Sequence, residues 1–209
     1  MDLDLLTKYC EGLCIPESEV LKELERETNL KTLKPRMISG HLQGTLLHLL
    51  VKIHGSKRIL EIGTFTGYAT ICMASALPDD GKLITLEANA ELEFISGKYF
   101  KKANLTDKIH QKFGDAKALV KDLDGEFDLV FIDAGKKDNE YYYETIFPQV
   151  KSGGLILVDN VLWSGKVLNH NMDKHTSIIN DFNVKMSRDQ RIESLYLPLR
   201  DGLALFRKK

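Results

Sequence analysis

Apolar residues near the N-terminus recur at the spacing of one helix face. The first such segment begins near Leu3, the second opens at Pro16 and runs to about Asn29, and the third follows Gly40. Residues three and four positions apart share one side of a helix, so each segment is predicted to be helical. We therefore expect residues 1–54 to form a helical N-terminal cap.

From Gly55 onward, short apolar runs alternate with amphipathic stretches. Runs rich in Val, Ile, Leu and Phe are typical of buried parallel strands. Strands that alternate regularly with helices predict a parallel sheet with right-handed crossovers. The predicted strands are 58–63, 83–87, 108–113, 127–133 and 155–159, and the predicted helices are 67–77, 90–104, 115–123, 139–150 and 173–187.

Two further apolar runs, 192–199 and 203–207, close the chain with Asp201-Gly202 between them. That dipeptide favours a tight antiparallel hairpin. The expected fold is α/β and Rossmann-like: a mostly parallel seven-stranded sheet that ends in an antiparallel hairpin, with helices on both faces. We see no repeat or linker, and the length suits one domain, 1–209, made of the cap and an α/β core at 55–209.

The composition narrows the classes of function and the location. Lys and Arg total 29 and Asp and Glu total 30, a net charge of −1, which gives no support for binding to nucleic acid or anionic membranes. The cysteines, Cys10, Cys14 and Cys72, form no CxxC pair and predict reduced thiols in a cytoplasmic protein. The acidic start at residues 1–4 lacks the apolar core of a signal peptide, and no apolar run is long enough to span a bilayer.

A glycine turn, Gly63-Thr-Phe-Thr-Gly67, joins the first predicted strand to the next helix. Glycine allows close approach to a ligand, and the helix N-terminus offers free N–H groups. The spacing is not the dinucleotide pattern G-x-G-x-x-G, and a tight turn without a ligand is an equal alternative. Glu87 and Asp115 end or follow the next two strands; each alone suits a solvated loop or a helix N-cap. Together the three strand ends favour a cofactor that contains a nucleoside.

Acidic and amide side chains end two apolar runs further along the chain. Asp133 follows one run, and Asp159 and Asn160 close another. The carboxyl ends of parallel strands meet at one edge of a sheet, where α/β proteins bind ligands. Three oxygen ligands at one point suit a hard divalent cation. The alternative is that Asp159-Asn160 caps a turn and that Lys136 is a solvated loop lysine.

Several motifs together resemble the class I S-adenosylmethionine-dependent, cation-dependent O-methyltransferases, the family that includes caffeoyl-CoA and catechol O-methyltransferases and bacterial relatives. Residues 60–68 (LEIGTFTGY) resemble its motif I, and 131–136 (FIDAGK) and 158–163 (VDNVLW) resemble its metal motifs. Residues 35–44 resemble its cofactor-closing segment, and 201–203 its final hairpin. The resemblance runs from about residue 33 to the end and implies the Rossmann-like methyltransferase fold.

The resemblance also implies roles for individual residues. Asp133, Asp159 and Asn160 would hold the cation, usually Mg2+, with Ca2+ or Mn2+ as variants. Lys136 and Asp133 would be catalytic. Trp163 directly follows the second metal motif, and we expect it either to form a wall for an aromatic acceptor or to pack over the sheet edge. The N-terminal helices would cover the cofactor and help to build a homodimer. The cofactor-binding residues would be Met37, Ser39, Glu61, Gly63, Thr64, Gly67, Tyr68, Glu87, Asp115, Ala116 and Asp133.

The chain departs from the family at two points. The segment after Asp133 carries an extra residue, which leaves Lys136 and Lys137 as alternatives for the active lysine; the three-residue offset from Asp133 favours Lys136. Leu195 stands where the animal catechol enzymes place a Glu. That difference speaks against close mimicry of catecholamine recognition.

The expected reaction is transfer of a methyl group from S-adenosylmethionine to a hydroxyl of a small catechol-like or caffeoyl-type acceptor. A phenol, with a pKa of about 10, is mostly protonated at neutral pH, and a dication stabilises its phenolate. A site with only three protein ligands leaves positions for two vicinal oxygens, which favours catechols. The alternatives are a nicotinamide-dependent oxidoreductase, for which the glycine spacing is wrong, and a non-catalytic cofactor-binding protein.

Overall fold

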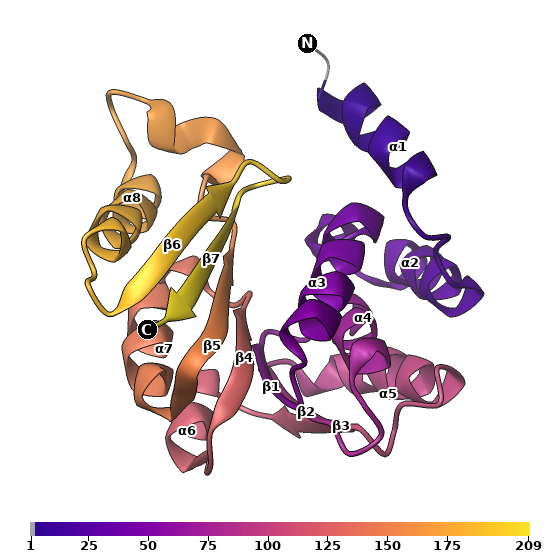
Figure 1. The fold of residues 1–209 in the computed structure, drawn as a ribbon. Helices are drawn as coiled ribbons and strands as arrows, with labels where there is room; N and C mark the ends of the chain where they lie inside the picture. The colour runs from indigo at the N-terminus through magenta and orange to yellow at the C-terminus, as the bar shows by residue number, and fades with distance from the viewer. Residues whose placement is uncertain (1–2) are drawn as a thin grey trace. The chain divides into compact units, whose positions relative to one another are not determined.

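The structure, a computed structural model, describes residues 3–209, so the first two residues of the acidic N-terminal segment lie outside the described residues. Its strands form a seven-stranded sheet in the order β3-β2-β1-β4-β5-β7-β6. The pairs β2–β3, β1–β4 and β4–β5 are parallel, whereas β5–β7 and β6–β7 are antiparallel. This is the predicted mostly parallel sheet with an antiparallel hairpin at one end (Figure 1).

The chain divides into two compact units. The first contains the residues up to Lys57 and Thr64–Phe113, and the second contains Arg58–Gly63 and Gly114–Lys209. The first unit is mostly helical, and helices occupy most of residues 3–54, where they were predicted. Its elements are α1 (Leu3–Leu13), α2 (Glu19–Lys31), η1 (Pro35–Met37), α3 (His41–His54), α4 (Tyr68–Ala76), β2 (Lys82–Glu87), η2 (Ala90–Leu92), α5 (Glu93–Lys102) and β3 (Ile109–Phe113).

Helix α2 begins later than the sequence indicated. Pro16 was expected in its first turn, but the helix starts at Glu19, because the hydroxyl of Ser18 accepts a hydrogen bond from the Leu21 N–H and caps the N-terminus there. Cys14 lies just beyond α1, which ends at Leu13. All three cysteines are free thiols, as predicted.

The second unit contains the strand ends that carry the predicted metal ligands. Strand β4 is buried along its whole length, and β5 is ten residues long, because a register shift next to Phe127 adds residues 150–154 to the predicted strand. Its elements are β1 (Arg58–Ile62), α6 (Ala116–Leu119), η3 (Val120–Asp122), β4 (Phe127–Ile132), η4 (Lys136–Asp138), α7 (Asn139–Ile146), η5 (Phe147–Gln149), β5 (Val150–Asp159), η6 (Trp163–Leu168), α8 (Lys174–Ser187), β6 (Ile192–Leu197) and β7 (Leu203–Lys208).

Aromatic side chains pack α7 and α8 onto the antiparallel end of the sheet. Phe206 of β7 contacts the rings of Tyr143 and Phe182, and all three are almost fully buried. Tyr143 and Tyr142 thus belong to the core.

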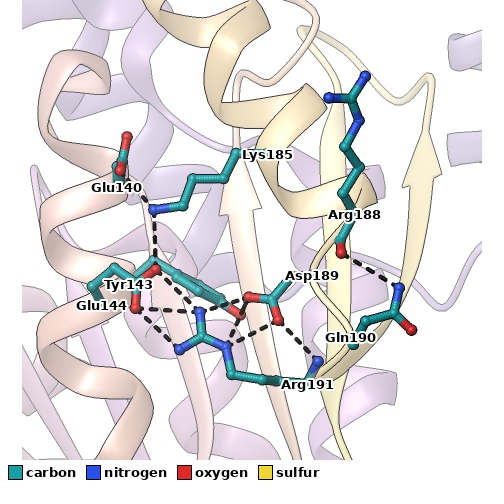
Figure 2. A network of polar contacts seen from close by, with 8 residues as sticks. All are labelled: Glu140, Tyr143, Glu144, Lys185, Arg188, Asp189, Gln190 and Arg191. Atoms are coloured by element: carbon teal, nitrogen blue, oxygen red, sulfur yellow. Dashed lines mark hydrogen bonds and ion pairs between the residues drawn. The ribbon is translucent and has the colours of Figure 1, made fainter.

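A network of charges fastens the turn between α8 and β6 to α7 (Figure 2). Arg191 pairs with Asp189 at 2.6 Å and with Glu144 at 3.1 Å, and Lys185 reaches Glu144 at 3.2 Å. The Tyr143 hydroxyl donates to Asp189 at 3.0 Å. Because the Asp189 carboxylate is nearly buried, Arg191 is the charge that compensates it.

The β6–β7 hairpin forms where it was predicted, but its connection is longer than a two-residue turn. Leu197 pairs with Leu203, so residues 198–202 make the connection. Arg200 and Gly202 both adopt positive φ, 52° and 91°. The backbone carbonyl of Asp201 accepts hydrogen bonds from Leu162 and Trp163, which ties the hairpin to the segment after β5.

Candidate functional site

Two carboxylates lie side by side where β4 and β5 end. The strands are parallel neighbours with Ile132 opposite Val158, so the next residues in register are Asp133 and Asp159. Asp159 is 5% exposed, and the Asp133 side chain is 19% exposed. The convergence inferred from the sequence is therefore present for this pair, and the register of two adjacent strands is its cause.

Lys136 compensates part of this negative charge. Its Nζ lies 2.6 Å from Oδ1 of Asp133, three residues earlier in the chain, and Lys136 is the first residue of η4. Burial raises the pKa of Asp133, the charge of Asp159 raises it further, and Lys136 and Arg200 lower it. Lys137, the alternative lysine, is exposed. The geometry thus places Lys136, and not its neighbour, beside the carboxylate pair.

Asn160 is held in an unusual conformation at the same edge. Its φ is 60°, in the left-handed region that Asn tolerates better than most residues. Its backbone N–H donates to Asp159 Oδ1 at 2.8 Å, and its side-chain Nδ2 lies 3.4 Å from Asp201 Oδ2. An amide that directs its NH2 group to Asp201 leaves its carbonyl oxygen to serve as a ligand.

The donor set suits a hard divalent cation. Two carboxylates and one amide oxygen are the ligand types that Mg2+, Ca2+ and Mn2+ prefer. The raised pKa of Asp133 reflects burial first and like charge from Asp159 second, and a dication would offset the like charge. Within residues 3–209, no group of three or more His, Cys, Asp or Glu side chains is arranged to hold a metal. Any metal site here depends on the amide of Asn160 as its third protein ligand.

Asp201 was predicted only as a hairpin residue, and its contacts are a feature that sequence reasoning missed. Its Oδ1 accepts from Ser164 at 2.9 Å, and its Oδ2 faces Asn160. Gly202 packs so closely on Leu162 that a Cβ there would collide with it. The Asp-Gly pair marks a turn in the sequence, but only the antiparallel pairing of β5 with β7 brings that turn beside Asn160.

Trp163, predicted as an acceptor wall, follows in the same strained segment. It is half-buried with φ of 48°, and its backbone N–H donates to the Asp201 carbonyl at 3.1 Å. Ser164 and Gly165 also adopt positive φ. The hairpin therefore fixes the backbone that carries the Trp163 side chain.

In the first unit, a hydrogen bond joins Glu87 to the glycine turn. Glu87 is 9% exposed, and its two oxygens accept from the N–H groups of Phe65 at 2.7 Å and Asn89 at 2.9 Å. The hydroxyls of Thr64 and Thr85 lie 2.6 Å apart. A carboxylate fixed in this way keeps lone pairs for further donors, as a ribose-binding acid needs.

Tyr68 has a different environment from the one its motif suggests. Its ring is 2% exposed and packs against Gly44 of α3, where a Cβ would lie 2.8 Å from Cε1 of the ring. Its hydroxyl donates to Glu17. We therefore expect the backbone of Tyr68, and not its side chain, to contribute to the cofactor-binding turn. Of the other predicted residues in this unit, Ser39 is 5% exposed and Met37, in η1, is 54% exposed.

The remaining cofactor candidates belong to the second unit. Glu61 is fully buried in β1, and Gly63 follows that strand with φ of 105°. A Cβ at Gly63 would collide with the backbone oxygen of Asp133, so only glycine permits this close passage of two strand ends. Asp115 is an exposed N-cap of α6 that accepts from Lys117 N–H at 3.0 Å, and Ala116 is 9% exposed.

A cavity of about 450 Å3 lies in the first unit. It is lined by the α1–α2 connection, α3, α4 and the end of α5, and includes His48 and Cys72. None of the predicted cofactor residues lines it. The imidazole Nδ1 of His48 lies 3.2 Å from both the Cys72 carbonyl and the Ser75 hydroxyl, so this histidine is a satisfied structural residue.

Comparison with known proteins gives one consistent result. A protein-family model described as O-methyltransferase matches residues 11–209. Caffeoyl-CoA O-methyltransferase 1 of Zea mays is 36% identical over 205 residues, which cover 92% of this chain and 79% of the maize protein. This finding favours methyl transfer over the nicotinamide alternative and over a non-catalytic binding protein.

Two solved structures are similar along nearly the whole chain. An O-methyltransferase from Bacillus cereus in complex with SAH is 30% identical with a TM-score of 0.90, covering 98% of this chain and 97% of that one. The O-methyltransferase TomG from Streptomyces achromogenes, in complex with SAM, is 29% identical with a TM-score of 0.87, covering 96% and 94%. SAM and SAH are S-adenosylmethionine and its demethylated product.

Proposed function

The chain belongs to the O-methyltransferase family, and from that premise we propose that it methylates a hydroxyl of a small catechol-like or caffeoyl-type acceptor with the help of a divalent cation. It is an enzyme that uses S-adenosylmethionine as the methyl donor. The acceptor class and the cation are our proposals. The observation that carries them is the adjacent pair Asp133 and Asp159 with Asn160 beside it.

The proposed metal ligands are Asp133, Asp159 and Asn160. When bound, a divalent cation stabilises a phenolate and orients two vicinal oxygens. Asp201 supports this arrangement, because it takes the NH2 group of Asn160 and so directs the amide oxygen the other way. We propose Mg2+ as the cation, with Ca2+ or Mn2+ as substitutes, since all three prefer oxygen ligands.

Lys136 is the residue we assign to the accepting oxygen. Its Nζ lies 2.6 Å from Asp133 Oδ1, at the edge of the sheet where the carboxylate pair stands. We infer that Nζ stabilises negative charge on the acceptor oxygen as it attacks the sulfonium methyl group. Trp163, on the strained segment after β5, is proposed to limit where an aromatic acceptor can lie.

For the cofactor, we propose that Glu87 binds the ribose hydroxyls and that the turn Gly63–Gly67 borders the methionine part. Both Glu87 oxygens are held by backbone N–H groups, so the carboxylate is oriented before a ligand arrives. Met37, Ser39, Asp115 and Ala116 remain proposed contacts that rest on the family resemblance. Glu61 is proposed to act from within β1, where it is fully buried.

Chelation tests the cation and the acceptor class together. Methyl transfer to catechol or caffeoyl-CoA should vanish in EDTA and return with Mg2+. Full activity in the chelator would contradict cation assistance. Activity that is restored by Mg2+ only with acceptors that have a single isolated hydroxyl would contradict the catechol-like class. A screen of catechols, flavonoids and CoA thioesters with labelled cofactor then identifies the acceptor.

Assembly and location are proposals of the same kind. We propose a cytoplasmic homodimer, on the resemblance to the family, without nucleic-acid or membrane partners. Light scattering of the purified protein tests the dimer, which a monomer mass would contradict. Among the residues that the structure describes, no helix combines the length and the apolar character needed to cross a membrane.

A further inference from the structure

Helix α2 carries one buried hydroxyl that faces the glycine turn. Thr28 is fully buried, and its Oγ1 lies 3.0 Å from Oγ1 of Thr66 and 2.8 Å from the carbonyl of Leu24. Thr66 is also fully buried. The Thr28 hydroxyl is placed to donate to either oxygen, and its single hydrogen serves one of them at a time. Removing either hydroxyl leaves the other without this partner.

A second contact joins the same N-terminal segment to the end of the turn. Glu17, just before α2, accepts the hydrogen bond of the Tyr68 hydroxyl. Burial raises the pKa of Tyr68 and the contact with Glu17 raises it further, so the phenol stays neutral and remains a donor. The ring lies against Gly44 of α3, where a larger residue would not fit. These contacts fix the position of Tyr68, which is the first residue of α4.

The contacts around the turn divide between two elements. Strand β2 and its end hold the first half, through Thr85 on Thr64 and Glu87 on the N–H of Phe65. The segment around α2 holds the second half, through the contacts to Thr66 and Tyr68. Between them, Gly67 has φ of 93° and passes so near Phe100 that a Cβ would lie 2.5 Å from its ring.

We propose that Thr28 and Glu17 are positioning residues that set the conformation of the cofactor-binding glycine turn from outside the site. The proposal rests on the proposed function only in assigning this turn to S-adenosylmethionine. A turn that is held on one side only must be ordered when the cofactor binds. The conformational entropy lost in that ordering weakens cofactor binding. Loss of the α2 contacts should therefore raise the Kd and KM for the cofactor and leave kcat at saturation nearly unchanged.

The test is calorimetric titration of the full-length protein with S-adenosylhomocysteine in EDTA, which removes any contribution from the metal. Thr28→Val keeps the shape and removes the hydroxyl, and Thr28→Ser keeps the hydroxyl. We expect about tenfold weaker binding for Thr28→Val, equivalent to about 1.4 kcal/mol and within the usual cost of orphaning a buried hydroxyl. Thr28→Ser should bind within about twofold of wild type, since its hydroxyl bond is kept.

The matched control is Thr176→Val. Thr176 is another buried threonine whose hydroxyl bonds to a neighbour, Asp173 at 2.9 Å, but it lies in α8 of the second unit. It should lower Tm without changing the Kd. Hydrogen exchange adds a local readout: the amides of residues 64–68 should exchange faster in Thr28→Val and at the wild-type rate in Thr176→Val.

Each outcome decides the proposal. An unchanged Kd in Thr28→Val, an equal loss in Thr176→Val, or a loss in Thr28→Ser as large as in Thr28→Val would overturn it. If Thr28→Val does not fold, Glu17→Ala against Glu17→Gln gives the same comparison, because glutamine still accepts from Tyr68. Wild-type protein that binds no S-adenosylhomocysteine would instead overturn the cofactor assignment, which separates the two failures.

Discussion

Asn160 directs its side-chain NH2 group at the carboxylate of Asp201, with Nδ2 and Oδ2 3.4 Å apart. The two residues are 41 positions apart in the chain, and the pairing of β5 with β7 brings them together. Oxygen ligands of metals are commonly oriented by such outer contacts. The relationship makes the final hairpin part of the proposed metal site rather than a closing element of the sheet alone.

Replacing Asp201 should therefore weaken the metal without weakening the cofactor. We expect Asp201→Ala to raise the Mg2+ concentration for half-maximal activity by about 10- to 100-fold, the usual cost of losing an outer contact. Ser164→Ala removes the other partner of Asp201, which leaves Asn160 in place, and should have a smaller effect. An Mg2+ requirement equal to that of wild type in Asp201→Ala would contradict the positioning of Asn160. S-adenosylhomocysteine binding in EDTA serves as the folding control.

The lysine assignment leads to a separate prediction. Lys136→Met should lower kcat by about 100-fold or more, the cost of removing one charged donor from a developing oxyanion. Metal affinity should not fall at a pH well above the pKa of Asp133, because the substitution removes a positive charge beside the cation. Lys137→Met is the matched control and should be close to wild type, since Lys137 is exposed. A loss in Lys137→Met with normal activity in Lys136→Met would reverse the assignment.

Metal affinity should depend on pH through Asp133. Burial and the charge of Asp159 raise the pKa of this carboxyl to about 6, above its ordinary value of 3.8. Below about pH 6 the carboxyl holds a proton that the cation must displace, so Mg2+ affinity should fall by up to about tenfold per pH unit. Titration calorimetry at pH 5.5, 6.5 and 7.5 measures this, and buffers of different ionisation enthalpy detect the released proton.

In the metal-free protein, lowering the pH has the opposite effect: protonation of Asp133 adds to the stability of the fold. Because its folded pKa is raised, the folded state binds more protons than the unfolded state between about pH 4 and 6. Protein in EDTA should gain this contribution to stability as pH falls through that window, relative to Asp133→Asn. Equal pH dependence in wild type and Asp133→Asn would show that the carboxyl titrates at its ordinary pKa.

The charge network around Arg191 predicts a distinct acid sensitivity. Hydrogen bonds from Arg191 lower the pKa of Asp189 to about 2 from 3.8, so its stabilisation is present above about pH 4 and is lost as pH falls towards 2. We expect Arg191→Met to lower the free energy of unfolding by about 2 kcal/mol at pH 7 and by much less near pH 2.

A half-exposed ion pair in the same unit serves as the control for this network. Arg207 pairs with Glu193 at 3.1 Å, and both side chains are more than half exposed. Arg207→Met should cost less than about 1 kcal/mol, as expected of a solvated pair. Denaturant unfolding of the two variants at pH 7 and pH 3 makes the comparison. Equal losses in both variants would contradict a special role for the nearly buried Asp189.

The sequence predicted elements better than it predicted their ends. Strands were placed correctly because runs such as 129–132 are apolar throughout, which is typical of buried strands. The start of α2 was wrong by about one turn, because Ser18 competes with Pro16 as the starting signal and only the cap geometry decides. The extra residues of β5 were missed because Lys151 and Ser152 are exposed and polar, so they do not extend the apolar run.

For the candidate site too, the sequence predicted local features and missed contacts between distant segments. It predicted that Asp133 and Asp159 end strands, because each follows a buried apolar run, and that Gly63 and Gly67 form a turn. It could not show that Asp201 supports Asn160 or that Thr28 bonds to Thr66, because no local pattern records contacts between distant segments. Those contacts were decided by strand pairing and helix packing, which bring together buried polar groups that must find partners.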